Sequence, residues 1–465
     1  MTEDIDRFVQ LCEKFAEIDL LGSGPPSPPY GNSPTRQAVK EAIERGAPGL
    51  PQSYRDDYVA KLLEEQSLSN ALRLPPDLLE AVTGAVYQHA PASEVQPQLQ
   101  RFLAVISHLY HTFTSQAKGD ELHITMASPL PPLALFQHSG MNGPFTVPSD
   151  SMKGLTGTSI GVVSLPSAYR DYPVLWASLA HETAGHDVKH ATGSLLLELQ
   201  QVVRALFDTD PLPSDFLNIT PDQIQGILWS YWIDETAADV YGLLNMGPTY
   251  ALNFSSYLAA LRHRLNPGAM PIPSVLTRSI VPGNKFLDTH PTDILRLYLA
   301  IGVIENLSSL SETVRDHYIT MLKQITQRCA HGVTEVPVQG FVPISLDRPE
   351  IALRLSFSRT LEEIQDVARR VGAHLATVQL HTLTNHSIQY IETWDDADEL
   401  IAQQIAAALQ SGASVVSMGN DTQLLAGATL ALFADAEKFT VVNERLAEAL
   451  DHSYKLDPTW GTPAV

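Results

Sequence analysis

His181-Glu182-Thr183-Ala184-Gly185-His186 is the stretch that decides the fold, because it combines two imidazoles and a carboxylate within one helical pattern. Apolar side chains recur at helical spacing around it, and this pattern runs from about residue 172 to residue 190. Zinc in a hydrolase takes three protein ligands, commonly histidine and carboxylate, and keeps a fourth position for water. The stretch therefore predicts a helix in which His181 and His186 bind zinc and Glu182 lies beside the metal.

The spacing of these two histidines departs from that of a regular helix. Side chains four positions apart differ in direction by about 40°, whereas side chains five positions apart differ by about 140° and cannot share an ion. The extra residue is most simply absorbed by one π-type turn centred on residues 183–185, which are small and end in a flexible glycine. An alternative frame is His186-Asp187-Val188-Lys189-His190, which has four-residue spacing and an aspartate in the position of the base.

A second acidic stretch, Asp234-Glu235-Thr236-Ala237-Ala238-Asp239, lies downstream in another helical pattern. Glu235 and Asp239 are four positions apart, so both lie on one face of the helix. The two alanines between them are small enough to let this helix approach the first one closely. Glu235 is the predicted third zinc ligand, and Asp239 is expected to accept a hydrogen bond from a ligand imidazole and fix its tautomer.

These motifs carry a resemblance to known metallopeptidases. Residues 181–186 resemble the His-Glu-x-x-Gly-His signature of the dipeptidyl peptidase III family, and residues 234–239 are similar to its second, acidic motif. The surroundings resemble the peptidases related to heat-shock protease HtpX and the CAAX prenyl protease. Residues 235–242 fit their Glu-x-x-Ala-Asp-x-x-Gly pattern, and residues 290–296 fit their His-Pro-x-x-x-x-Arg pattern. The resemblance covers roughly residues 120–307, about 40% of the chain, and implies the gluzincin class of zinc metallopeptidases.

The resemblance also implies a role for each residue of the site. His181, His186 and Glu235 would hold one Zn²⁺ per chain, and Asp239 would orient a ligand histidine. Glu182 would be the general base that polarises the metal-bound water and later carries a proton to the leaving amine.

The group that stabilises the oxyanion is less clearly marked in the sequence. His290 is one candidate, and a tyrosine near the second motif, Tyr231 or Tyr241, is another. Together these roles predict a zinc-dependent peptidase that acts on a peptide or protein substrate. The alternatives are a catalytically inactive zinc-binding scaffold or regulatory protein, and a structural protein without metal.

Composition excludes several other classes of protein. The net charge of −22 over 465 residues disfavours nucleic acid and anionic membranes as partners. Cys12 and Cys329 are the only cysteines, which excludes a cysteine-rich metal site and leaves either one long-range disulfide or two buried thiols. The N-terminus is acidic, unlike a secretory signal, and no stretch reaches the roughly 18 apolar residues of a membrane span. We therefore expect a soluble, cytoplasmic protein.

Changes in pattern divide the chain into three predicted parts. Residues 1–118 are expected to form an N-terminal helical region, residues 119–330 a zincin-like metallopeptidase domain, and residues 331–465 an α-rich C-terminal domain. Strands are expected at residues 121–126 and 159–165, the second as the edge strand beside the active cleft. The predicted fold class is α+β and predominantly helical, with a small sheet over the zinc helix.

Apolar residues at helical spacing, separated by Pro, Gly and Ser breaks, predict the remaining helices. The first contains Phe8, Leu11, Phe15 and Ile18, and the others are expected at residues 35–45, 54–72, 76–89, 95–112, 221–244, 291–307, 360–374, 398–411 and 422–434. Asn420 is expected to cap the last of these.

Overall fold

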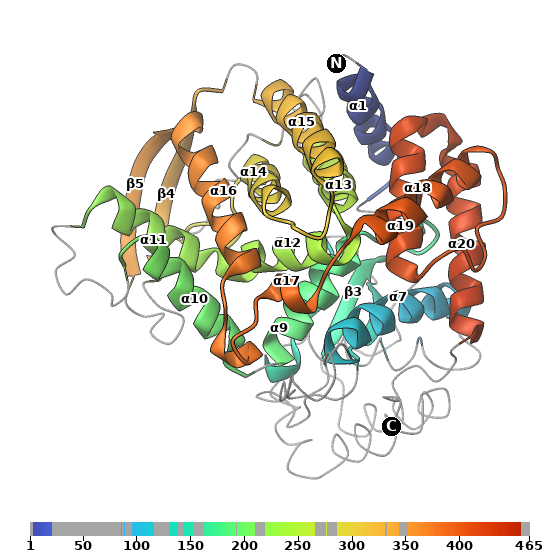
Figure 1. The fold of residues 1–465 in the computed structure, drawn as a ribbon, viewed down its shortest axis with the longest axis horizontal. Coiled ribbons are helices and arrows are strands. Elements are labelled where there is room, and N and C mark those ends of the chain that lie inside the picture. The colour runs from blue at the N-terminus through green and yellow to red at the C-terminus, as the bar shows by residue number, and fades with distance from the viewer. Residues whose placement is uncertain are drawn as a thin grey trace, which may run out of the picture.

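Helices form most of the described part of the chain, together with two small sheets, which confirms the predominantly helical α+β class (Figure 1). The structure is a computed structural model that describes residues 3–20, 85, 88, 95–115, 131–137, 143–151, 161–191, 193–209, 219–265, 276, 286–330, 333–343 and 352–456. Several predicted elements lie outside the described residues, namely the strand at residues 121–126 and the helices at residues 35–45 and 54–72. The same holds for the helix predicted at residues 76–89, of which only residues 85 and 88 are described.

The first sheet has three strands, β1 (Leu133–Gln137), β2 (Phe145–Val147) and β3 (Val162–Pro166), in the order β1-β3-β2. β1 runs parallel to β3, and β2 runs antiparallel to it. The prediction that residues 159–165 form the edge strand is therefore wrong, because their described part belongs to the central strand. Every residue of β3 is buried, as expected of a strand paired on both sides, and β2 is the edge strand next to the site.

After β3 the chain passes through two short 3₁₀ turns and enters a π-helix, η6 (Ala180–Asp187), which continues into α9 (Val188–Ala191). The widening predicted around residues 183–185 is thus confirmed. η6 packs against α12 (Ile233–Met246), and the contact is closest at Gly185. A Cβ atom at Gly185 would lie 2.5 Å from the Cβ of Ala238, so only glycine permits this approach.

The helix predicted at residues 221–244 is divided at Trp232. α11 (Pro221–Tyr231) begins at a capping box in which Thr220 and Gln223 bond to each other's backbone N–H groups, and α12 follows it. α13 (Thr249–Leu265), α14 (Asp293–Glu305) and α15 (Glu312–Cys329) complete the central part. The helices nearer the N-terminus are α1 (Glu3–Ala16), α7 (Gln96–Ser115) and α10 (Leu195–Leu206).

The C-terminal third begins with an antiparallel strand pair that the sequence patterns did not predict, β4 (Glu335–Pro343) and β5 (Ala352–Thr360). The other described elements of this third are helical. Its helices are α16 (Leu361–Thr377), α17 (Ile388–Ile391), α18 (Asp396–Gln410), α19 (Asp421–Ala434) and α20 (Phe439–Leu456). The predicted cap is present, since the Asn420 side chain accepts a hydrogen bond from the N–H of Gln423.

The C-terminal helices share one hydrophobic core with the rest of the described chain. α16 packs on α14, α19 packs on α1 and α13, and α20 packs on α7. β4 and β5 lie at one end of the molecule and α18 to α20 at the other (Figure 1). The division of the chain into three parts stays a prediction.

Two further findings concern the sequence-based expectations. Cys12 and Cys329 are both buried free thiols, so the long-range disulfide is not formed. Among the helices that the structure describes, none is both long enough and apolar enough to cross a bilayer.

Candidate metal centre

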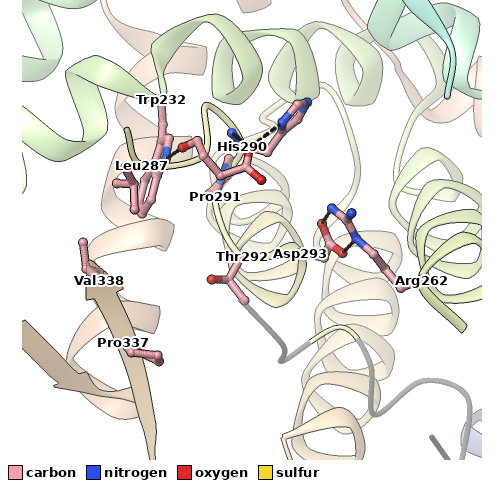
Figure 2. A pocket seen from close by; sticks show the side chains of 10 residues that line it. Trp232, Arg262, Leu287, His290, Pro291, Thr292, Asp293, Pro337 and Val338 are labelled. Carbon is pink, nitrogen blue, oxygen red and sulfur yellow. Dashed lines mark hydrogen bonds and ion pairs between the residues drawn. The ribbon is translucent and has the colours of Figure 1, made fainter. Parts of the chain in front are cut away.

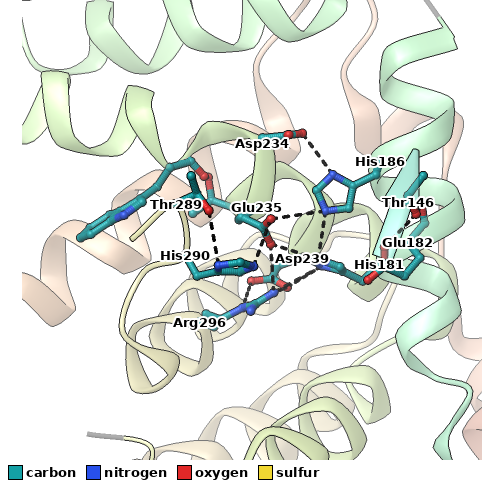
Figure 3. Close-up of polar contacts among 12 residues, drawn as sticks. Thr146, His181, Glu182, His186, Asp234, Glu235, Asp239, Thr289, His290 and Arg296 are labelled. Atoms are coloured by element: carbon teal, nitrogen blue, oxygen red, sulfur yellow. Dashed lines mark hydrogen bonds and ion pairs between the residues drawn. The ribbon is translucent and has the colours of Figure 1, made fainter. Parts of the chain in front are cut away.

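η6 and α12 bring the three predicted zinc ligands together (Figure 3). The ligand atoms of His181, His186 and Glu235 all lie within 4.8 Å of one another, and all three side chains are buried. The two imidazole Nε2 atoms are 3.2 Å apart, and the Nε2 atom of His181 is 3.2 Å from Oε2 of Glu235. Histidine positions five apart can converge in this way because the π-helix absorbs the extra residue.

The outward nitrogens of both imidazoles face carboxylates. Nδ1 of His181 lies 3.1 Å from Oδ1 of Asp239, and Nδ1 of His186 lies 3.2 Å from Oδ1 of Asp234. A carboxylate accepts hydrogen bonds, so each Nδ1 carries the proton in the neutral imidazole and each Nε2 keeps a lone pair. Two lone pairs therefore point at each other and at the Glu235 carboxylate.

This concentration of electron pairs is the reason the residues fit a metal cation. Oε2 of Glu235 is buried and accepts no hydrogen bond, although buried carboxylate oxygens ordinarily do. Two neutral imidazoles and one carboxylate form a donor set that suits Zn²⁺. Burial lowers the pKa of His186, but the negative charges of Asp234 and Glu235 outweigh burial and raise that pKa to about 10, so the His186 imidazole holds a proton that a metal cation would replace. The same negative field favours a bound cation.

Asp239 lies where the predicted orienting role requires, at Nδ1 of His181, and is itself held by two further side chains. Arg296 donates to both oxygens of Asp239, from Nε at 2.6 Å and from Nη2 at 2.7 Å. The Tyr250 hydroxyl donates to Oδ1 at 2.9 Å. Burial raises the pKa of Asp239, but Arg296 and His181 more than offset burial and bring it down to about 2. Asp239 is therefore a carboxylate that keeps the His181 ring in one tautomer and orientation.

Arg296 was marked in the sequence only as the last residue of the His-Pro-x-x-x-x-Arg pattern, and no pattern marked Tyr250. Arg296 comes from α14 and Tyr250 from α13, so only the packing of these helices on α12 brings them to Asp239. The guanidinium of Arg296 also stacks over the Phe254 ring, 4.6 Å from its centroid.

Asp234 is a second positioning carboxylate that sequence reasoning did not assign. Its Oδ1 contacts Nδ1 of His186 and is 2.5 Å from Nζ of Lys189, whose side chain is fully buried. Its position as the first acidic residue of the motif Asp234-Glu235 is the sequence feature that could have indicated this role. His190 lies 3.3 Å from Asp234 and 2.9 Å from Asp150, and it is not one of the clustered ligands. The structure therefore does not use the alternative frame of residues 186–190.

Glu182 follows the first ligand directly and is buried on η6. Its Oε2 atom accepts a hydrogen bond of 2.7 Å from the Thr146 hydroxyl, and its backbone carbonyl accepts one of 3.0 Å from the same hydroxyl. Thr146 lies on the edge strand β2, so the sheet fixes the position of the predicted general base. No motif in the sequence indicated Thr146.

His290 reaches the centre from the loop before α14. Its Nε2 atom is 3.3 Å from Oε1 of Glu235, and its Nδ1 atom is 2.9 Å from Oδ1 of Asp288. Burial lowers the pKa of His290, whereas Glu235 and Asp288 raise it, and the net shift is upward. The side chain is 44% exposed, so His290 lies at the solvent side of the centre.

The structure does not bring the two tyrosine candidates to the centre. Tyr241 is fully buried against Phe113, and its hydroxyl makes no hydrogen bond. It follows Asp239 by two positions, which places it about 200° around the helix and therefore on the opposite face. The assignment of Tyr241 to the site is thus corrected. The hydroxyl of Tyr231 instead donates to the carbonyl of Leu287 at 2.7 Å.

No family model matches the chain, and no curated protein or solved structure matches it. The motifs and the geometry of the site therefore carry the functional argument.

Proposed function

We propose that this protein is a zinc-dependent peptidase of the gluzincin class. The observation that carries the proposal is the convergence of His181, His186 and Glu235 within 4.8 Å, with the buried Glu182 directly after His181 on η6. Both ligand imidazoles are backed by carboxylates, an arrangement that recurs at zinc sites because it raises the basicity of the ligand. Charge, ligand type and burial all favour a divalent cation here.

A zinc ion held by these ligands would supply Lewis acidity toward a water molecule and the scissile carbonyl. Glu182 accepts a proton from the attacking water and passes it to the leaving amine, which completes hydrolysis without a covalent enzyme intermediate. The Thr146 hydroxyl holds Oε2 of Glu182 and so limits the orientations of that carboxylate. His290, at the exposed side, can donate a hydrogen bond to the negative charge that develops on the carbonyl oxygen.

The edge strand β2 is suited to guide the substrate. Among the strands that the structure describes, β2 pairs only with β3, and an extended peptide can add to the other edge of such a strand through backbone hydrogen bonds. Thr146 lies in β2 and contacts Glu182, so a peptide paired there would pass close to the base. This assigns to β2 the role that the sequence patterns gave to residues 159–165.

The test is the substitution Glu182→Gln, which keeps the size of the side chain and removes the base. We expect the variant to retain about one zinc per chain by elemental analysis and to lose at least about 100-fold in the hydrolysis rate of a peptide library. Glu444→Gln, at an exposed position on α20, is the matched control and should retain full activity. Undiminished hydrolysis by Glu182→Gln would remove Glu182 from the mechanism. A zinc-loaded wild-type protein that cleaves no peptide would favour the inactive scaffold instead.

A further inference from the structure

A small pocket lies beside the metal centre, between the loop that precedes α14 and strand β4 (Figure 2). Its apolar walls are formed by Trp232, Leu287, Pro291 and Val338. His290 lines the same pocket and contacts Glu235 from there, at 3.3 Å. The pocket and the centre thus share one side chain, so a peptide whose carbonyl lies at the centre has a neighbouring side chain within reach of the pocket.

The walls of this pocket are held in place by hydrogen bonds from three parts of the chain. The indole Nε1 of Trp232 donates to the carbonyl of Asp288 at 2.9 Å, which joins the junction of α11 and α12 to the loop. The N–H of Leu287 donates to the carbonyl of Phe341 at 3.0 Å, which joins the loop to β4. The C-terminal third therefore contributes Val338 to a wall beside the site, a role that its sequence did not reveal.

The charged groups around the pocket are paired with one another. Arg262 donates to both oxygens of Asp293, at 2.8 and 3.3 Å, and Asp288 bonds to His290 at 2.9 Å (Figure 2). A charged side chain entering the pocket would lose hydration and would have to compete with these existing pairs. The lining consequently favours a neutral, apolar group.

The size of the pocket limits that group further. Its free volume is about 30 Å³. One water-sized group needs roughly 10–15 Å³ of such volume, so the pocket holds about two or three. This suits the side chain of alanine or valine and is too small for leucine or an aromatic ring without movement of the walls.

We propose that this pocket binds a small aliphatic side chain of the substrate, next to the bond that is cleaved, and that Val338 on β4 sets the upper limit of its size. The inference rests on the proposed peptidase function for the location of the bond, but the pocket can also be tested by binding alone. The expected substrates are neutral peptides with alanine or valine at one position beside the scissile bond.

The test uses blocked hexapeptides of otherwise constant sequence, with Ala, Val, Leu, Phe, Asp or Lys at each position in turn. Wild-type protein should prefer Ala or Val at one position, by about tenfold in kcat/KM over Leu, Phe, Asp and Lys. Val338→Ala removes two methyl groups from the wall and should shift the preference toward Leu by a similar factor. Val336→Ala is the matched control, since Val336 is buried on the same face of β4 and does not line the pocket.

A profile for Val338→Ala that equals that of Val336→Ala would overturn the pocket assignment and leave the peptidase proposal intact. Binding of the same peptides to zinc-loaded Glu182→Gln, measured by calorimetry, separates the two proposals further. One outcome supports the pocket and refutes the peptidase function. In that outcome no peptide is cleaved, but peptides with Ala or Val bind more tightly than the others, and Val338→Ala shifts this preference. Absence of both cleavage and binding would overturn both.

Discussion

Replacement of Gly185 by alanine tests whether the close approach of η6 and α12 builds the metal centre. The added Cβ would lie 2.5 Å from the Cβ of Ala238 and 2.6 Å from its Cα, whereas ordinary contacts are 3.4–4 Å. The obstructing atoms include backbone, so no rotamer change can relieve the clash. The two helices must separate by roughly 1 Å, and α12 carries Glu235 away from the imidazoles as it moves.

The expected loss of zinc affinity depends on which state of the protein, metal-free or zinc-bound, can relieve the clash. Overpacking of this kind costs about 1–3 kcal/mol. In the metal-free variant, α12 can shift outward and relieve the clash. Zinc requires its ligands within about 0.2 Å of ideal distances, so zinc binding forces the two helices back together and brings the strain back. Zinc affinity should therefore fall by the strain energy, which corresponds to a dissociation constant that rises by about 5-fold to about 150-fold.

The assay is competition for zinc between the protein and a chromophoric chelator. Gly193→Ala is the matched control, because a Cβ atom there meets nothing within 4 Å, and its zinc affinity should equal that of the wild type. Circular dichroism should show that both variants remain folded. If Gly185→Ala binds zinc as tightly as the control, the close contact between the helices does not determine the geometry of the ligands.

Three further substitutions test other parts of the structure. Asp234→Asn should weaken zinc binding by about 10- to 100-fold in the chelator assay, because it replaces the carboxylate behind His186, and unchanged affinity would refute that role. Tyr241→Phe should leave activity within about twofold of wild type, since its hydroxyl is buried and makes no hydrogen bond, and a tenfold loss would return Tyr241 to the site. Burial raises the pKa of Glu392 from 4.5 to about 8, so its protonated form stabilises the fold below pH 4.5 and this contribution is lost as the pH rises to 8. Glu392→Gln should therefore have the wild-type melting temperature at pH 4.5 and a higher one at pH 8.5. The gain at pH 8.5 corresponds to up to about 5 kcal/mol in the free energy of unfolding. Equal stabilisation at both pH values would contradict this expectation.

Local patterns predicted the parts of the fold that local interactions form. The helix α7 and the cap of α19 at Asn420 follow from apolar periodicity and from a side chain that satisfies a free backbone N–H group. The π-helix was predictable for a different reason. Two imidazoles five residues apart can reach one ion only if the helix widens between them, so the chemistry of the motif dictated the local backbone.

Local sequence patterns could not predict which strands pair with one another or which helices pack together. All residues of β3 except Ser164 are apolar, a pattern that fits a central strand and an edge strand equally, and only the pairing of β1 on its other side decides between the two. Tyr241 illustrates the same limit on a helix. Its place near the second motif suggested a role at the site, but the packing of α12 against Phe113 buries it on the far face.

The sequence by itself determined the identity of the candidate ligands and of the base, because His181, Glu182, His186 and Glu235 lie in two short motifs whose spacing is set by helix geometry. Tertiary structure decided what surrounds them. Thr146, Tyr250 and the lining residue Val338 come from a strand, a helix and a second sheet far apart in the chain, and no local pattern marks them. The physical reason is that a ligand set needs only two short segments to converge, whereas its hydrogen-bond partners and its pocket depend on how the whole core packs.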